Sequence, residues 1–292
     1  MVFLLLCILA NVIIFLAFRS FRLFGIHTLQ AIVVNYVVCI ITGFLFIGIE
    51  SGLPAYTPAM QSWIPLALAM GMLFVTTFYM MALTTQRVSV TVATLAAKMS
   101  LIIPVIFSLV YFESAKSAVG LVNYFGIGLS LFSIVLTAWP SRQIPQHSSA
   151  GLQRFTLPIL VFVCSGAIDT SLNFTNQFVI KPSEQSIFPV FVFASAAVSG
   201  IIWMLFRREA WQWKSVIGGI YLGIPNYFAI YFLLRALDAF GNNGALIFPG
   251  LNMGIILVSA CLAFLIFKER LSRINLLGMF LAALAMLSIF YG

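Results

Sequence analysis

The chain has 292 residues, of which 62% are hydrophobic and 8% are charged, and its mean hydropathy is +1.12. These values exclude an ordinary water-soluble domain, in which about 25% of residues are charged. The net charge of +8 does not indicate nucleic-acid binding, because the Lys and Arg residues stand singly or in small groups between apolar segments. We therefore expect a protein whose main partner is the lipid bilayer.

Apolar segments follow one another along the whole chain. A helix needs about 20 apolar residues to span a bilayer, and these segments are continuously apolar, whereas membrane strands alternate in polarity. The sequence therefore predicts an all-α polytopic membrane protein with ten transmembrane helices. The predicted helices cover residues 1–18, 28–48, 62–84, 88–112, 118–139, 155–180, 187–206, 215–237, 243–267 and 273–291.

The two halves of the chain are similar. Residues 140–154 hold the largest cluster of polar and turn-forming residues, which indicates a linker between a first five-helix repeat (1–139) and a second one (155–292). Near their ends, Glu113 and Glu269 are each followed by an Asn-x-x-Gly sequence, and we interpret both acids as structural. Because each half has five crossings, the second repeat is predicted to be inverted, an arrangement from which alternating-access transporters are built.

The distribution of basic residues predicts the orientation. Most Lys and Arg residues lie in the connections that follow the odd-numbered segments, and these connections should face the cytoplasm. Both termini are therefore expected outside, in a multi-pass protein of the bacterial inner membrane.

Short motifs at corresponding places in the halves carry a family resemblance. They are Phe78-Tyr79-Met80-Met81-Ala82-Leu83, Ala93, Pro104, Glu113 and Gly126 in the first half, and Tyr231, Ala236-Leu237, Ala245, Glu269 and Gly278 in the second. This pattern resembles the EamA-like branch of the drug/metabolite transporter superfamily. The resemblance implies export or uptake of small metabolites through a central cavity without ATP. The sequence agrees on ATP, because it has no GxxxxGK[ST] loop.

Lys98 is the single residue that most strongly indicates a functional site. It lies about ten residues into segment 88–112, roughly 15 Å from the helix start and near the middle of a hydrocarbon core about 30 Å thick. A charge there costs about 3 kcal/mol on insertion scales and needs a partner or water. Asp169 is the expected partner, because segments 88–112 and 155–180 should run parallel. The pair predicts a substrate-binding or coupling site, with a structural ion pair or a snorkelling Lys as the alternative.

Segment 155–180 carries a polar stripe. Asp169, Asn173, Asn176 and Gln177 follow Ser165 at spacings of four, four, three and four residues, which places the stripe on one helical face. The stripe predicts the lining of a wet cavity, and hydrogen bonding to neighbouring helices is the alternative.

Two later segments supply further candidates. In segment 215–237 these are Asn226 and Tyr231, and Arg235 on the same face as Tyr231 is expected to pair with Asp238 at the membrane edge. In segment 243–267, Asn252 follows Pro249-Gly250, which predicts either an interrupted helix at a substrate site or a kink used only for packing.

We predict a gradient-driven secondary transporter that moves a small polar or amphipathic metabolite by alternating access. No cofactor, metal or enzymatic activity is expected, because no cluster of His, Cys or acidic residues has ligand spacing. Protons or another ion are the expected coupling partner, and no oligomer is required. The alternative functions are a membrane-embedded lipid-processing enzyme and a lipid scramblase.

Overall fold

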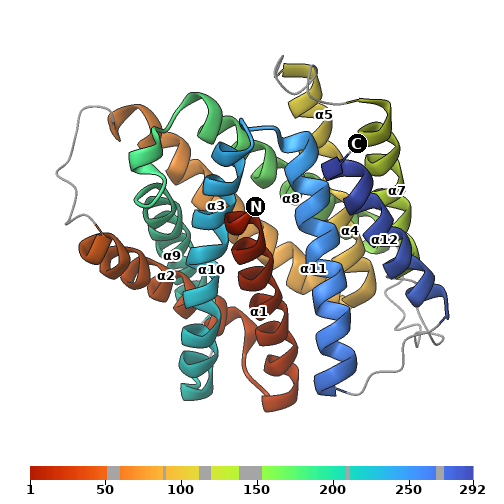
Figure 1. Cartoon of the computed structure of the whole chain (residues 1–292). Coiled ribbons are helices and arrows are strands. Elements are labelled where there is room, and N and C mark those ends of the chain that lie inside the picture. The colour runs from red at the N-terminus through yellow and green to blue at the C-terminus, as the bar shows by residue number, and fades with distance from the viewer. Residues whose placement is uncertain are drawn as a thin grey trace. The chain divides into compact units, whose positions relative to one another are not determined.

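A computed structural model describes residues 1–50, 60–87, 90–111, 120–137, 153–207, 211–267 and 273–291. Within these ranges the chain is helical and has no strand (Figure 1). Most of the predicted linker, together with Glu113 and Glu269, lies outside the described residues.

The predicted segments are helical, and most of their boundaries agree to within a few residues, except that the first helix extends six residues beyond the predicted end and segment 88–112 forms two helices. These helices are α1 (Val2–Phe24), α2 (Thr28–Glu50), α3 (Met60–Arg87), α4 (Val90–Met99), α5 (Ile102–Tyr111), α7 (Leu121–Thr137), α8 (Gln153–Phe178), α9 (Phe188–Arg207), α10 (Trp213–Ala239), α11 (Gly244–Phe267) and α12 (Arg273–Tyr291). A short 3₁₀ helix, η1 (Pro182–Glu184), precedes α9.

Helices long and apolar enough to span a membrane confirm an all-helical membrane architecture. Within the described ranges there are five, which comprise Thr28–Gly48, Ser62–Met81, Thr156–Phe178, Phe188–Phe206 and Trp213–Ala239. Apolar helical stretches of 10–17 residues occupy Val2–Phe18, Ala96–Tyr111, Leu121–Leu136, Gly244–Val258 and Leu276–Tyr291. Ten crossings and the inverted repeat stay predictions.

The predicted continuous helix 88–112 is wrong, because α4 ends at Met99 and α5 begins at Ile102. Pro104 leaves one helical hydrogen bond unmade at this break. It has no N–H to donate to the carbonyl of Ser100 four residues earlier, and its ring crowds that carbonyl. The Ser100 carbonyl instead accepts the N–H of Ile103 at 2.9 Å, and the N–H of Leu101 turns to the Lys98 carbonyl at 3.4 Å. The backbone hydrogen bonds therefore span three residues in place of four at Leu101 and Ile103, just after the end of α4.

The helices form two compact units, and each unit draws on both halves of the sequence. Unit 1 comprises Met1–Thr76 and Phe174–Ala239, and unit 2 comprises Thr77–Asn173 and Phe240–Gly292. The unit boundaries fall inside α3 and α8, so these two helices continue from one unit into the other.

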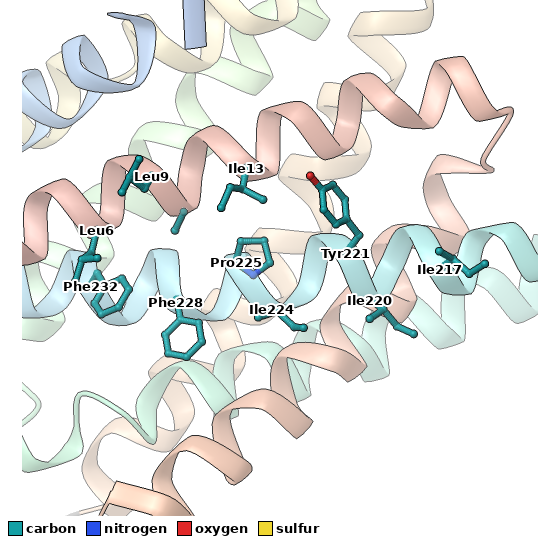
Figure 2. A pocket seen from close by; sticks show the side chains of 11 residues that line it. Leu6, Leu9, Ile13, Ile217, Ile220, Tyr221, Ile224, Pro225, Phe228 and Phe232 are labelled. Atoms are coloured by element: carbon teal, nitrogen blue, oxygen red, sulfur yellow. The ribbon is translucent and has the colours of Figure 1, made fainter. Parts of the chain in front are cut away.

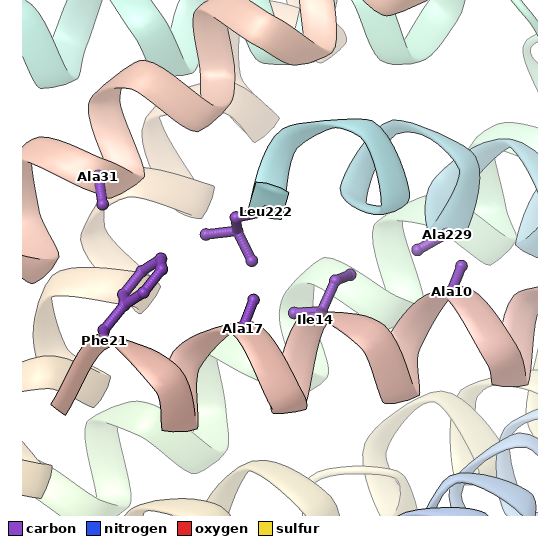
Figure 3. Packing of buried hydrophobic residues seen from close by; sticks show 7 residues of the cluster. All are labelled: Ala10, Ile14, Ala17, Phe21, Ala31, Leu222 and Ala229. Atoms are coloured by element: carbon purple, nitrogen blue, oxygen red, sulfur yellow. The ribbon is translucent and has the colours of Figure 1, made fainter. Parts of the chain in front are cut away.

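In unit 1, α10 packs against α1 and α2, and α2 also packs against α9. Gly219 and Gly223 permit the close approach of α10 to α2, because a Cβ on either would overlap Val34 or Val38. Small residues with this spacing are typical of membrane helix interfaces. Figure 3 shows the apolar cluster that joins α1 and α2 to α10, which contains Ala10, Ile14, Ala17, Phe21, Ala31, Leu222 and Ala229.

In unit 2, α12 packs against α7 and α11, and α11 also contacts α5 and α7. Gly126 lies close to Ser288 and Ile289 of α12, where the Asn123 amide donates to the Ile289 carbonyl at 2.9 Å. The helix α11 continues through Pro249, and a Cβ on Gly250 would overlap the Phe290 ring. Of the two alternatives predicted for Pro249-Gly250, the continuous helix agrees with the second, in which these residues serve the packing of α11 on α12.

Candidate functional site

Lys98 and Asp169 interact electrostatically within unit 2. Lys98 stands in the last turn of α4, directly before the break, and Asp169 lies in the apolar span of α8. Gly166 of α8 lies against Ile103 of α5, because a Cβ on Gly166 would overlap the Ile103 side chain. Both charged residues are partly exposed. An opposite charge nearby is one condition under which a charge is tolerated at membrane depth.

The break between α4 and α5 places irregular backbone beside the Lys98 side chain. Ser100 stabilises the end of α4, because its hydroxyl donates to the Ala97 carbonyl at 2.7 Å. Irregular backbone at membrane depth is tolerated where it is buried in protein or lines a water-filled cavity. Broken helices of this kind also form the binding sites of many secondary transporters.

Asn173 lies one helical turn after Asp169 on the same face of α8. Its side chain is 0% exposed, and neither amide atom has a hydrogen-bond partner among the described residues. The amide touches the start of α11, since a Cβ built on Gly244 would overlap Asn173 Nδ2. A buried amide without a partner costs about 1–3 kcal/mol, and such groups usually mark a site for water or a ligand.

A second unpartnered amide belongs to the residue before Gly244. Asn243, the residue before α11, is 4% exposed, and its side-chain nitrogen and oxygen both lack partners in the described part of the chain. Its main-chain carbonyl accepts the N–H groups of Leu246 and Ile247, each at 3.2 Å. The amide therefore does not cap its own helix. It stands at the N-terminal end of α11, where the helix dipole favours negative charge.

Unit 2 thus gathers an ammonium, a carboxylate, two amides without partners and the positive end of a helix. These groups can bind both charges of a small zwitterion, or the polar atoms of a neutral solute. Among the described residues, no three His, Cys, Asp or Glu side chains lie close enough to hold a metal ion.

The polar stripe of α8 divides between the units. Asn176 belongs to unit 1, where its Nδ2 donates to the Leu234 carbonyl at 3.1 Å and its Oδ1 accepts the Gln185 amide at 2.9 Å. Gln177 is exposed on the surface of the helix. The structure therefore gathers Asp169 and Asn173 with Lys98, whereas Asn176 connects α8 to α10.

The remaining predicted residues make contacts with other parts of their own units. Asn226 of unit 1 donates to Asn35 Oδ1 at 3.1 Å, which connects α10 to α2. Tyr231 stacks parallel to Tyr227, with ring centroids 6.3 Å apart. Asn252 lies in unit 2 and donates to the Phe248 carbonyl of its own helix at 3.0 Å.

The predicted pair of Arg235 and Asp238 does not form. Within the described ranges no carboxylate lies against Arg235, whose guanidinium carbon stands over the Phe3 ring at 5.3 Å and over the Tyr231 ring at 5.9 Å. Asp238 is exposed. The aromatic rings stabilise the cation through their negative faces.

The prediction missed Asn243. The Gly-Asn-Asn-Gly sequence at 241–244 is typical of a turn before a helix. Gly241 and Asn242 do adopt the left-handed conformation, with φ of 61° and 59°. A sequence cannot show, however, that the Asn243 amide lacks a hydrogen-bond partner among the described residues.

Comparisons with known proteins support the fold and give no activity. No family model matches the chain. An uncharacterized protein of Haemophilus influenzae is 28% identical over 267 residues, which cover 90% of this chain and 88% of the relative. A protein of known crystal structure is 15% identical and superposes with a TM-score of 0.76, covering 99% of this chain and 96% of that chain. The helical fold of this chain therefore occurs in a solved protein.

Proposed function

We propose that this protein is a gradient-driven secondary transporter of a small polar or amphipathic metabolite, and that the substrate binds at Lys98 and Asp169. One observation carries the proposal. Two opposite charges interact inside apolar helical segments, beside a break in one of them. Charges at this depth are rare and usually mark a substrate or ion pathway.

The surrounding groups support a zwitterionic or neutral substrate. Asp169 would receive an ammonium group, and Lys98 together with the start of α11 would receive a carboxylate. Asn173 and Asn243 would form with the substrate the hydrogen bonds that they do not make with the described residues. In this proposal the ten crossings form two inverted repeats of the EamA-like kind, and alternating access exposes the site to each side of the inner membrane in turn.

Uptake into proteoliposomes tests the proposal. The full chain is reconstituted and offered a panel of labelled zwitterionic, neutral, anionic and cationic metabolites, with and without a proton gradient. We expect accumulation of a zwitterionic or neutral compound, and loss of that accumulation in Asp169→Asn and in Lys98→Met.

The control is Lys214→Met, which removes an exposed Lys at the start of α10. Full uptake by both site variants at normal protein levels would reject the site. Lipid flipping without accumulation of any solute would reject transport in favour of a scramblase.

A further inference from the structure

An apolar groove of about 630 Å³ runs between α1 and α10 of unit 1. In Figure 2, Leu6, Leu9 and Ile13 come from α1, and the other labelled side chains come from α10. The groove is lined by Leu6, Leu9, Ala10, Ile13, Ile217, Ile220, Tyr221, Ile224, Pro225, Phe228 and Phe232. We call it the α1–α10 groove.

The lining is open as well as apolar. Ile217 is 71% exposed and Ile224 is 47% exposed, and both belong to an α10 span that is long and apolar enough to cross a membrane. Water in such a groove would lie against hydrocarbon side chains at a free-energy cost. A lipid acyl chain avoids that cost and matches the elongated shape between two helices.

A cation stands at one end of the groove. The lining residues Phe228 and Phe232 share a face of α10 with Arg235, which lies one turn farther along. Phe3 stacks on Phe232 with centroids 6.4 Å apart, and the Arg235 guanidinium lies over Phe3. Arg235 therefore continues the groove beyond Phe232, close to the end of α10 at Ala239.

The guanidinium of Arg235 is held in place but lacks an acceptor. Its Nε is enclosed and has no hydrogen-bond partner among the described residues. Side-chain cations near helix ends lie at the level of lipid headgroups, and guanidinium groups bind phosphate through paired hydrogen bonds. Asp238, three residues later and exposed, supplies a carboxylate near the same place.

We propose that the α1–α10 groove binds one molecule of phosphatidylethanolamine. An acyl chain fills the groove, the phosphate accepts hydrogen bonds from Arg235, and the primary ammonium of the headgroup lies toward Asp238. Charge complementarity selects this lipid. Phosphatidylglycerol has no cation for Asp238, and the methylated ammonium of phosphatidylcholine has no N–H to donate.

Native mass spectrometry of the full chain in detergent tests the proposal. Phosphatidylethanolamine, phosphatidylglycerol and phosphatidylcholine with identical acyl chains are titrated separately. Hydrogen bonds to charged groups favour phosphatidylethanolamine by about tenfold in affinity over the other two. Arg235→Gln should lower that affinity by about tenfold, and Asp238→Asn should remove the preference over the other lipids.

A second variant, which alters the groove and leaves Arg235 intact, tests the proposal even if substitution of Arg235 disturbs folding. Ile13→Trp fills the groove from α1 and should weaken binding while Arg235 is intact. The matched control is Ile202→Trp on α9, because Ile202 is 50% exposed and lies outside the groove. Equal binding of the three lipids by the unmodified protein, or unchanged binding by Arg235→Gln and Ile13→Trp, would overturn the proposal. The outcome does not depend on whether the protein transports a solute.

Discussion

Asn173 and Asn176 stand three residues apart on α8, and their surroundings differ completely. Asn176 makes two hydrogen bonds within unit 1, to Leu234 and Gln185. Asn173, in unit 2, is fully buried and makes none with the described residues. A polar residue in a membrane helix therefore does not indicate a site merely by its presence. The informative property is whether the protein itself satisfies its hydrogen bonds.

The same contrast extends to the neighbours of these two residues. Asn226 of unit 1 pairs with Asn35, whose own Nδ2 donates to the Ile32 carbonyl. In unit 2, Asn243 lacks partners among the described residues as Asn173 does. The interacting charges, Lys98 and Asp169, also belong to unit 2. We infer that Asn176 and Asn226 hold helices together and that Asn173 and Asn243 bind a ligand.

The largest expected effect follows from removing the charges of unit 2. Lys98→Met or Asp169→Asn should each lower uptake by at least about a hundredfold, because each leaves an opposite charge without its partner. If the two residues act as one unit, the double variant should be no worse than the worse single variant. Initial uptake rates in proteoliposomes measure both effects. Additive losses would indicate that the residues act separately.

A larger residue at Gly223 should disrupt the hydrogen bond between Asn226 and Asn35 in unit 1. A larger side chain there would overlap Val38 and crowd the Asn35 carbonyl, so α10 and α2 would separate near the hydrogen bond from Asn226 to Asn35. Gly223→Leu should lower the free energy of unfolding by about 3 kcal/mol. Thermal unfolding in detergent measures this loss of stability. The control is Gly48→Leu, because a Cβ on Gly48 has no neighbour within 4 Å. Equal destabilisation by both variants would contradict the packing described for Gly223.

Asn252 should show the smallest effect. Its side chain donates to the Phe248 carbonyl of the same helix, so it connects no two elements. Asn252→Leu should change the free energy of unfolding by less than about 1 kcal/mol, as for most single polar residues in membrane helices. Destabilisation similar to that of Gly223→Leu would show that Asn252 has a greater role than this hydrogen bond.

The sequence predicts the helices well because apolar length alone determines them in a bilayer. It locates Lys98 and Asp169 for the same reason, since charges are conspicuous in apolar segments. It does not separate Asn173 from Asn176, because helical periodicity places both on one face and only tertiary contacts satisfy the second. Pro104 and Pro249 show the same limit. The helix breaks before Pro104, whereas α11 continues through Pro249 and α10 through Pro225, and the sequence alone does not distinguish these prolines.

The central claim is that Asn173 serves a ligand and Asn226 serves the fold. Asn173→Ala and Asn226→Ala are compared by uptake rate per folded molecule and by thermal unfolding. The account predicts that Asn173→Ala lowers uptake by about tenfold or more without loss of stability, since it removes a buried amide that lacks a partner. It predicts that Asn226→Ala lowers the free energy of unfolding by about 1–3 kcal/mol and retains uptake. Loss of stability in Asn173→Ala with full uptake by its folded molecules would contradict the account.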